Sequence, residues 1–428
     1  MTTSKRGQSV YLPYGDTEVK LTLPPSARLT VVSPNPVEPV SDPVAEIRRA
    51  LAEPIGAVPL RDAARGARSV VILADDLTRQ TPVDTIIPLL LDELEEAGIP
   101  DAQVTVLIAL GTHRPMTGPE IESRFGTAVT QRVAVVNNPW YDLAQLIDLG
   151  VTPNGTPIQV SRLAYEADFL IGLGSIVPHH IPGYSAGAKI VQPGISGAAT
   201  TGATHYLSTR TRRSYLGLVD NPVRAEMERI AELVGLNAVL NTVLDHTGRA
   251  VRAFYGDPRR AFRAGVALSR EVYGAALPGP ADVVVAGSHP CDIEFWQAHK
   301  SLYPADIAVR AGGTIVVVTP CPEGVAVSHR DMLQFTALDS ARIAALIEDG
   351  TIGDVVSGAL ALAWAKTRER ADVSLVSGGI SDEEARALRF TPFAALQDAV
   401  DAALRRHGPE ATVTVLTHAP EMLPLLPG

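Results

Sequence analysis

Cysteine is scarce in this sequence, which has only Cys291 and Cys321 among its 428 residues. Two cysteines provide neither a disulfide framework nor a CxxC metal motif, and such low usage is typical of a reducing compartment. Any bound metal must therefore be held mainly by histidine or by a cofactor.

Long hydrophobic runs and dense basic segments are missing as well. No stretch of about 20 apolar residues is present to span a bilayer, and the N-terminal segment MTTSKRGQSVYLPYGD lacks the apolar run of a secretory signal. Asp and Glu outnumber Lys and Arg by 47 to 37, which gives a net charge of −10. Nucleic-acid binding needs a concentrated basic surface. We therefore expect a cytoplasmic protein with no membrane or nucleic-acid partner.

The composition that remains is typical of a compact α/β protein, with 46% hydrophobic and 20% charged residues, 35 Gly and 33 Pro. The length exceeds what one hydrophobic core usually supports, so two domains are expected. In the first half, short β-branched runs alternate with helical patterns such as Val83–Ala97, which indicates a largely parallel sheet. The strand candidates are Ser69–Ala74, Gln103–Leu110, Arg132–Val136 and Asp168–Leu173.

A second series of elements follows the Gly-, Pro- and Ala-rich segment Tyr273–Ala281, which we interpret as a linker. Its strand candidates are Asp282–Ala286 and Gly313–Val318, and Ser340–Glu348 is a helix candidate. We predict two α/β domains with mainly parallel sheets and an active-site cleft between them: a catalytic and cofactor-binding domain over residues 1–275 and a second domain over 276–408. The last strand candidate, Ala411–Thr417, either closes the second sheet or returns to the first, in which case residues 409–428 complete the first domain.

Two polar motifs follow strands of the first half, where α/β sheets place their ligands. The first, DDLTRQTP from Asp75 to Pro82, joins a strand to a helix. Thr78 can donate a hydroxyl hydrogen bond there and the Arg79 guanidinium suits a carboxylate or phosphate, although a simple helix cap fits the same residues. The second motif holds His113, whose imidazole can act as a general base near pH 7 or as a structural hydrogen-bonding group.

The segment Gly174–His205 is rich in small residues and combines two adjacent histidines, one lysine and a further histidine. Small residues let the backbone approach a bulky ligand, and Lys189 lies where a flexible amine can reach that ligand. His179 and His205 are too far apart in the sequence for a local zinc motif. A flexible substrate loop with incidental histidines explains the glycines but not the lysine between them.

In the second half, Gln297 and Lys300 are three residues apart and therefore share one face of a predicted helix. A neutral donor beside a cation suits a carboxylate. An exposed amphipathic helix fits the same two residues.

Taken together and in this order, the four segments resemble the nickel-dependent lactate racemase family, whose members use a nickel-pincer nucleotide cofactor. The most specific part of the resemblance is the pattern P-H-x-x-x-G-x-S-x-G-x-K at Pro178–Lys189, followed by Pro193-Gly194 and by His205. The resemblance covers the motifs from Asp75 to Lys300.

The resemblance implies a role for each of the residues singled out above. It implies that the cofactor, nickel pyridinium-3,5-bisthiocarboxylic acid mononucleotide, is tethered to Lys189 and that its nickel is ligated by His205. It implies that His113 and His179 are the acid/base pair. The remaining residues that it places at the cofactor or substrate are Asp76, Thr78, Arg79, Gln297 and Lys300.

The implied reaction inverts C2 of a 2-hydroxy acid by reversible hydride transfer through a 2-keto acid, because a hydrogen on a hydroxyl-bearing carbon is too weakly acidic for a histidine base. The implied partners are a small 2-hydroxy acid and the proteins that make the cofactor. Two positions depart from the family. Ala186-Gly187 replaces the usual Gly-Gly, and the segment GDVVSGALALAW has valines where the family's active-site Trp is expected, with Trp364 several positions later. We therefore expect a substrate side chain larger than methyl, either short and aliphatic or polyhydroxylated.

Two other functions fit the residues without the resemblance. A hydrolase or lyase with a zinc or iron site is one, built from His113, His179 and His205. A non-catalytic protein that binds a nucleotide or a sugar acid is the other, with the charged motifs only holding the ligand.

Overall fold

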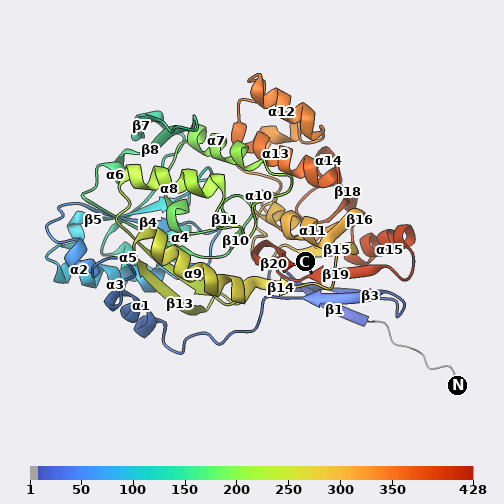
Figure 1. Cartoon of the computed structure of the whole chain (residues 1–428), viewed down its shortest axis with the longest axis horizontal. Coiled ribbons are helices and arrows are strands. Elements are labelled where there is room, and N and C mark those ends of the chain that lie inside the picture. Colours follow the sequence, from blue (N-terminus) through green and yellow to red (C-terminus); the bar gives the residue numbers. More distant parts are fainter. Residues whose placement is uncertain (1–7, 428) are drawn as a thin grey trace.

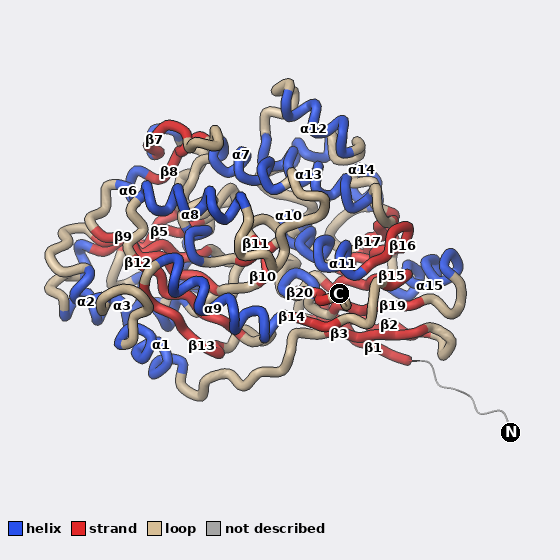
Figure 2. The backbone as a smooth tube through the Cα atoms, in the orientation of Figure 1, coloured by secondary structure: helices blue, strands red, loops and turns tan. Residues whose placement is uncertain are grey.

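The structure is a computed structural model that describes residues 8–427. Residues 1–7, which begin the segment where no secretory signal is expected, lie outside the described residues, as does residue 428. Two six-stranded sheets lie side by side, and helices cover both (Figures 1 and 2). The predicted α/β class with mainly parallel sheets is confirmed. Among the described residues, no helix has the length and apolar character needed to cross a membrane.

The first sheet is parallel except for its edge strand β13. In spatial order its strands are β13 (Ala250–Gly256), β12 (Ala238–Leu244), β9 (Phe169–Ser175), β4 (Val70–Asp75), β5 (Val104–Ala109) and β6 (Ala134–Asn137). Every residue of β4, VVILAD, is buried. A central parallel strand is covered on both faces, and this explains why the strand is a continuous apolar run up to Ala74.

Helices pack on the two faces of this sheet. Val70 and Ile72 point to one face of the sheet and share a hydrophobic core with five helices. These are α1 (Pro43–Ala52), α2 (Leu60–Ala63), α3 (Val83–Glu96), α4 (Gly118–Phe125) and α5 (Thr127–Thr130). The opposite face, with Val71 and Leu73, is covered by helices that include α8 (Pro222–Val234), and α9 (Pro258–Tyr273) packs on β12 and β13. The predicted helix Val83–Ala97 is confirmed as α3.

The second sheet is parallel throughout. In spatial order its strands are β18 (Thr391–Phe393), β17 (Asp372–Val376), β16 (Val309–Val318), β15 (Ala281–Gly287), β19 (Thr412–Leu416) and β3 (Arg28–Val32). Its helices are α11 (Leu302–Ala308), α12 (Ser340–Glu348), α13 (Val355–Arg368), α14 (Asp382–Ala387) and α15 (Leu396–His407). The hairpin β1 (Gln8–Tyr14) and β2 (Thr17–Leu23) shares a core with this sheet.

The last strand candidate belongs to the second sheet: β19 lies between β15 and β3. Its interior valines Val413 and Val415 are fully buried, which needs a neighbour on each side and cover on both faces. Figure 1 shows the blue N-terminal strands beside this red C-terminal strand. The division into domains over residues 1–275 and 276–408 stays a prediction. The two sheets divide the chain differently, because β3 and β19 both belong to the second sheet.

The predicted linker contains a short strand, β14 (Gly274–Ala276), which pairs with β20 (Leu423–Leu425). The chain therefore returns after β19 to the junction of the two units, and Figure 1 shows β20 in the middle of the molecule. The other strands are β7 (Leu146–Val151), β8 (Pro157–Ser161), β10 (Pro178–His179) and β11 (Gly183–Tyr184), and the other α-helices are α6 (Arg162–Tyr165), α7 (Ala198–Ser208) and α10 (Phe295–Ala298). The 3-10 helices are η1 (Asp101–Gln103), η2 (Leu143–Gln145), η3 (Gly187–Ile190), η4 (His299–Ser301), η5 (Arg330–Gln334) and η6 (Ala419–Glu421).

Candidate active site

A cleft lies where the carboxyl ends of β4, β5 and β9 meet the second unit, as expected for an α/β sheet. It contains about 900 Å³ of space outside protein atoms, its opening included. All the predicted site residues except Thr78 line it. They are Asp76, Arg79, His113, His179, Lys189, His205, Gln297 and Lys300.

Asp76 and His113 form the best-defined pair in the cleft, with Asp76 Oδ2 2.6 Å from His113 Nδ1. Asp76 Oδ1 accepts hydrogen bonds from the backbone N–H of Thr78, at 3.0 Å, and from the Thr78 hydroxyl. Burial by itself raises the pKa of the Asp76 carboxyl, but His113, Arg79 and Thr78 together lower it below its usual value. An ionised Asp76 holds the hydrogen of the His113 ring on Nδ1, so that Nε2 is free to accept a proton.

The residues on either side of His113 tie its loop to the second unit. The hydroxyl of Thr112 lies 3.0 Å from Nε2 of His329. The guanidinium of Arg114 binds Glu323 through two hydrogen bonds of 3.1 and 2.7 Å. His113 is therefore held between two contacts that cross the cleft.

Gln297 links His113 to the cations. Its Nε2 donates a hydrogen bond to Nε2 of His113 at 3.0 Å, and its Oε1 accepts from Lys300 Nζ and, at 3.5 Å, from Arg79 Nη1. The predicted helix around Gln297 is broken into α10, η4 and α11, with Gln297 in the first and Lys300 in the second. The two side chains nevertheless face each other, as their spacing indicates.

Arg79 and Lys300 bring two positive charges to the same end of the cleft. Arg79 donates to the carbonyl and hydroxyl oxygens of Thr78, at 2.9 and 2.7 Å, and Lys300 Nζ lies 3.8 Å from the Cys291 sulfur. Neither forms an ion pair with a carboxylate among residues 8–427. Burial, helped by Arg79, lowers the pKa of Lys300 to about 8. Two cations without a protein counter-ion can bind a ligand carboxylate.

The loop from β9 to η3 is held in place by a buried arginine. Arg224 donates to the backbone carbonyl oxygens of Pro182, Tyr184 and Ala186. Ala186 has φ 61° and ψ −167°, a conformation that is essentially restricted to glycine. This position, where the resemblance implies a glycine, is thus one where the chain adopts a strained backbone conformation, and the Ala186 methyl group faces Gly174.

Lys189 emerges from η3, at the end of this loop, into the cleft. Burial lowers the pKa of Lys189 well below its usual value, and the nearby charges of Arg79 and Lys300 lower it further. These effects favour the uncharged form of the amine. An uncharged amine is the nucleophilic form that a covalent bond to a ligand requires.

His205 lies in the last turn of α7. Its Nδ1 donates to the backbone oxygen of Thr201 at 2.9 Å, which leaves Nε2 without a hydrogen. Burial, with a contribution from Lys189, lowers the pKa of His205 to about 3. A neutral imidazole whose second nitrogen is oriented by a carbonyl is the usual form of a histidine metal ligand.

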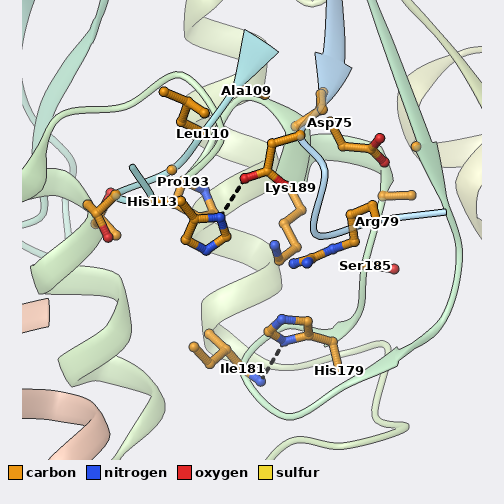
Figure 3. Close-up of a pocket in the computed structure, with 18 of the residues that line it drawn as sticks. Asp75, Arg79, Ala109, Leu110, His113, His179, Ile181, Ser185, Lys189 and Pro193 are labelled. Atoms are coloured by element: carbon orange, nitrogen blue, oxygen red, sulfur yellow. Dashed lines mark hydrogen bonds and ion pairs between the residues drawn. The ribbon is translucent and has the colours of Figure 1, made fainter. Parts of the chain in front are cut away.

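His179 approaches the cleft from the side opposite His113. Figure 3 shows the ends of Lys189 and Arg79 between the rings of His113 and His179. Nδ1 of His179 accepts the backbone N–H of Ile181 at 3.2 Å. Burial is the main cause that lowers the pKa of His179 well below its usual value. A neutral His179 therefore presents its Nε2–H to the cleft.

The structure adds cleft residues that the sequence analysis missed. They are, among others, His180, Trp296, His299 and Leu360. His180 and His299 directly adjoin the predicted His179 and Lys300, and this adjacency was the available signal. Leu360 carries no local signal because it reads as one apolar position among many in α13.

The two valines at the position of the expected Trp do not line the cleft. Val355 packs against Gly202 of α7, and Val356 is buried in the core. Leu360, about one turn further along α13, supplies the apolar wall instead. Trp364 is fully buried behind it and packs against Phe295. The valines therefore do not replace the expected Trp in the wall of the cleft, and a substrate side chain larger than methyl stays a prediction.

The three histidines do not form a joint metal site. Among the described residues, no group of three or more His, Cys, Asp or Glu side chains has the arrangement to hold a metal ion. A hydrolase built on His113, His179 and His205 as common ligands therefore lacks support.

Comparison with known proteins gives concordant matches. The family model described as the lactate racemase N-terminal domain matches residues 14–217. Lactate racemases of Thermoanaerobacterium thermosaccharolyticum and Lactiplantibacillus plantarum are 32% and 31% identical over 283 and 284 residues, 65% of this chain. The aligned parts cover 66% of the length of these curated relatives, just under two thirds.

Solved structures extend the likeness to nearly the whole chain. The lactate racemase apoprotein from T. thermosaccharolyticum matches with a TM-score of 0.87 and 25% identity, over 98% of this chain and 100% of that one. A structural genomics protein from Thermotoga maritima matches with a TM-score of 0.74 over 91% of this chain and 99% of that one. At 20% identity, the second likeness concerns the fold alone.

The fold and the cleft define a two-sheet α/β enzyme with histidines and unpaired cations at the junction of its units. The chain belongs to the lactate racemase family. The family predicted from the sequence motifs is thereby confirmed, and with it the expectation of an enzyme.

Proposed function

We propose that this enzyme is a racemase or epimerase that inverts C2 of a 2-hydroxy acid, with a nickel-pincer nucleotide as cofactor. The observation that carries the proposal is the convergence of four kinds of group on one cleft. These are a buried lysine amine whose pKa is lowered, a histidine with a free Nε2, two further imidazoles and two cations without a carboxylate partner among the described residues. We further infer that the protein acts in the cytoplasm, where the proteins that make the cofactor would load it, and its low cysteine usage supports this location.

The residues of the cleft fit such a cofactor. Lys189 would offer its amine for a thioamide tether, helped by its lowered pKa, and His205 would offer one nickel ligand; the cofactor itself would supply the others. Gly194, which lines the cleft, lets the backbone pack closely there, since a side chain on it would collide with the backbone oxygen of Ile190. When bound, the cofactor would take up the hydride from C2 and return it.

Arg79 and Lys300 would bind and orient the substrate carboxylate. Arg79 presents a planar guanidinium and Lys300 a point charge, so a carboxylate lying between them is held in direction as well as in place. Fixing the carboxylate fixes C2, and such positioning accounts for much of an enzyme's rate enhancement. Their proton donors also polarise the oxygen that becomes a carbonyl.

His113 is the base best prepared to take the hydroxyl proton. Its Nδ1 hydrogen points to Asp76, so the proton arrives at Nε2 and the resulting positive charge is stabilised by the carboxylate. Gln297, which donates to this Nε2, must give way to the substrate hydroxyl. His179 would face the hydroxyl oxygen of the opposite enantiomer. It can act as base there only when its ring hydrogen lies on Nδ1, which requires Nδ1 to give up the hydrogen bond that it accepts from Ile181.

Inversion of single-enantiomer 2-hydroxy acids tests the proposal. The protein is produced with and without the cofactor-making proteins, and its mass and nickel content are measured. We expect a covalent adduct on Lys189 only in the loaded form. Inversion, measured by chiral chromatography, is likewise expected only in that form. Loaded protein that inverts none of a broad panel would overturn the proposed reaction. An adduct-free protein that binds the same acids would instead favour a binding protein.

A further inference from the structure

A second pocket adjoins the catalytic end of the cleft. It shares Arg79, Ser175, His179 and Lys300 with the cleft and contains about 840 Å³ of space outside protein atoms, its opening included. It therefore lies directly beside the two cations that hold the substrate carboxylate in the proposed function. The polar residues that it adds and that can meet a ligand include Thr78, Cys291 and Glu421.

Glu421 reaches this pocket from the C-terminal end of the chain. It ends η6, which packs against η4, the element of Lys300, and against β10, the element of His179. Glu421 is only 8% exposed, and its Oε2 has no hydrogen-bond partner among the described residues. Buried carboxyl oxygens are normally satisfied, so a carboxyl group that lines a pocket and has an oxygen without a partner points to a ligand.

Glu421 can accept a hydrogen bond from a ligand hydroxyl in either of its protonation states. Burial raises the pKa of Glu421 to about 7, although His289, Lys300 and Arg79 act to lower it. Near neutral pH the side chain is thus present both as carboxylate and as acid. Both forms accept a hydrogen bond from a hydroxyl group.

We propose that this pocket receives the side chain of the 2-hydroxy acid, and that the substrate is polyhydroxylated, with one of its hydroxyls donating a hydrogen bond to Glu421. The inference rests on the proposed function, because the carboxylate must lie on Arg79 and Lys300 for the side chain to enter here.

The other classes of side chain suit the pocket less well. A second carboxylate would face the acidic group of Glu421, and a cationic side chain would face Arg79 and Lys300. A purely aliphatic chain would bury Glu421 further and leave its oxygens unsatisfied. A neutral chain with several hydroxyls meets none of these penalties and can also use the Thr78 and Cys291 side chains.

Binding to cofactor-loaded protein tests the subsite without requiring turnover. Titration calorimetry compares an aldonic acid such as gluconate with 2-hydroxybutyrate and malate. The variants are Glu421→Leu, which removes the acceptor, and Glu421→Gln, which keeps an acceptor oxygen. Glu410→Gln, at an exposed glutamate of the same chain end, is the matched control.

We expect wild-type protein to bind the aldonic acid most tightly. Glu421→Leu should weaken that binding about tenfold or more and leave 2-hydroxybutyrate within about twofold, because only the former loses a hydrogen bond to the carboxyl group. Glu421→Gln should retain part of the preference and can be tested even if the leucine variant does not fold. Glu410→Gln should bind like wild type.

The outcomes separate the subsite from the reaction. Equal loss of both ligands in Glu421→Leu, with an unchanged melting temperature, would overturn the subsite. So would tighter binding of malate or 2-hydroxybutyrate than of the aldonic acid. If loaded enzyme inverts 2-hydroxybutyrate but no aldonic acid, the inference fails while the proposed function stands; inversion of neither acid, nor of any other in the panel, contradicts the proposed function itself.

Discussion

Gln297, from the second unit, donates a hydrogen bond from its Nε2 to Nε2 of His113, from the first unit, over 3.0 Å. Asp76 binds the other nitrogen of the same ring, and Lys300 binds the other end of the same amide. This chain of contacts orients the His113 ring from both sides of the cleft. It also means that the atom we propose as base is occupied until a ligand displaces Gln297.

Substitution at the two kinds of histidine should have different effects. His113→Ala should lower turnover by about 100- to 10,000-fold, because a positioned acid/base group contributes about that much, while nickel content stays at the wild-type level. His205→Ala should lose nickel, because its Nε2 is the proposed protein ligand. Metal analysis of purified, loaded protein distinguishes them. Wild-type nickel content in His205→Ala would contradict its role as ligand.

Asp76→Asn should reduce turnover by about 100-fold or more without loss of the fold. An amide can donate to Nδ1 of His113 and so favour the tautomer that carries its hydrogen on Nε2, which blocks the base. Steady-state kinetics at several pH values measure the effect, and nickel content is the control. Activity of Asp76→Asn close to that of wild type would show that the pair does not set the tautomer.

The affinity for substrate should fall as the pH rises through about 8. The pKa of Lys300 is lowered to about 8, mainly by burial, so its positive charge is present below that pH and lost above it. Lys300→Arg keeps the charge at alkaline pH and should flatten the dependence, whatever its effect on absolute affinity. The KM for a 2-hydroxy acid between pH 7 and 10 is the measurement. A parallel pH dependence in both proteins would assign the loss to another group.

Ala186→Gly should stabilise the protein by about 1 kcal/mol, because glycine adopts the observed backbone conformation without the strain that alanine bears there. The neighbouring Ala188→Gly is the matched control: Ala188 is not among the described residues with positive φ, so its replacement should destabilise by about 0.5–1 kcal/mol. Denaturant unfolding measures both. Destabilisation in Ala186→Gly comparable to that in Ala188→Gly would show that the strain is not relieved.

Replacing the buried Arg224 should loosen the loop from β9 to η3, which carries Lys189. Arg224→Leu leaves the carbonyl oxygens of Pro182, Tyr184 and Ala186 without their donor, at a cost of about 1–3 kcal/mol for each buried group that finds no other partner. We expect a lower melting temperature and poorer formation of the Lys189 adduct, followed by intact mass. Normal adduct formation in a folded variant would show that the loop keeps its shape unaided.

The sequence by itself was sufficient for β4, β5, β6 and β9 of the first sheet, for β15, β16 and β19 of the second, for the helix α3 and for the family, whereas β3, β12, β13, β17 and β18 were not predicted. Continuous apolar runs such as VVILA specify buried parallel strands, because a strand covered on both faces has no polar side. The motif around Lys189 is recognisable because a side chain would collide at its glycines: with the backbone of Leu218 at Gly183, with the ring of Phe262 at Gly187 and with the backbone of Ile190 at Gly194. The spacing of these glycines can be read in the sequence, although two of the three contacts involve residues distant in the chain.

Only the tertiary structure decided which residues meet across the cleft. His113 and Gln297 are separated by 184 positions, and Thr112 and His329 by 217. Glu421 reaches the site through a C-terminal segment whose strand pairs with β14, and Leu360 does so through the packing of α13 on α7. Periodicity reports which face of an element is buried, not against what, so these contacts follow from how the two units dock. The loop from β9 to η3 that carries Lys189 could therefore be recognised from the sequence, whereas the residues that form the walls of the substrate pocket could not.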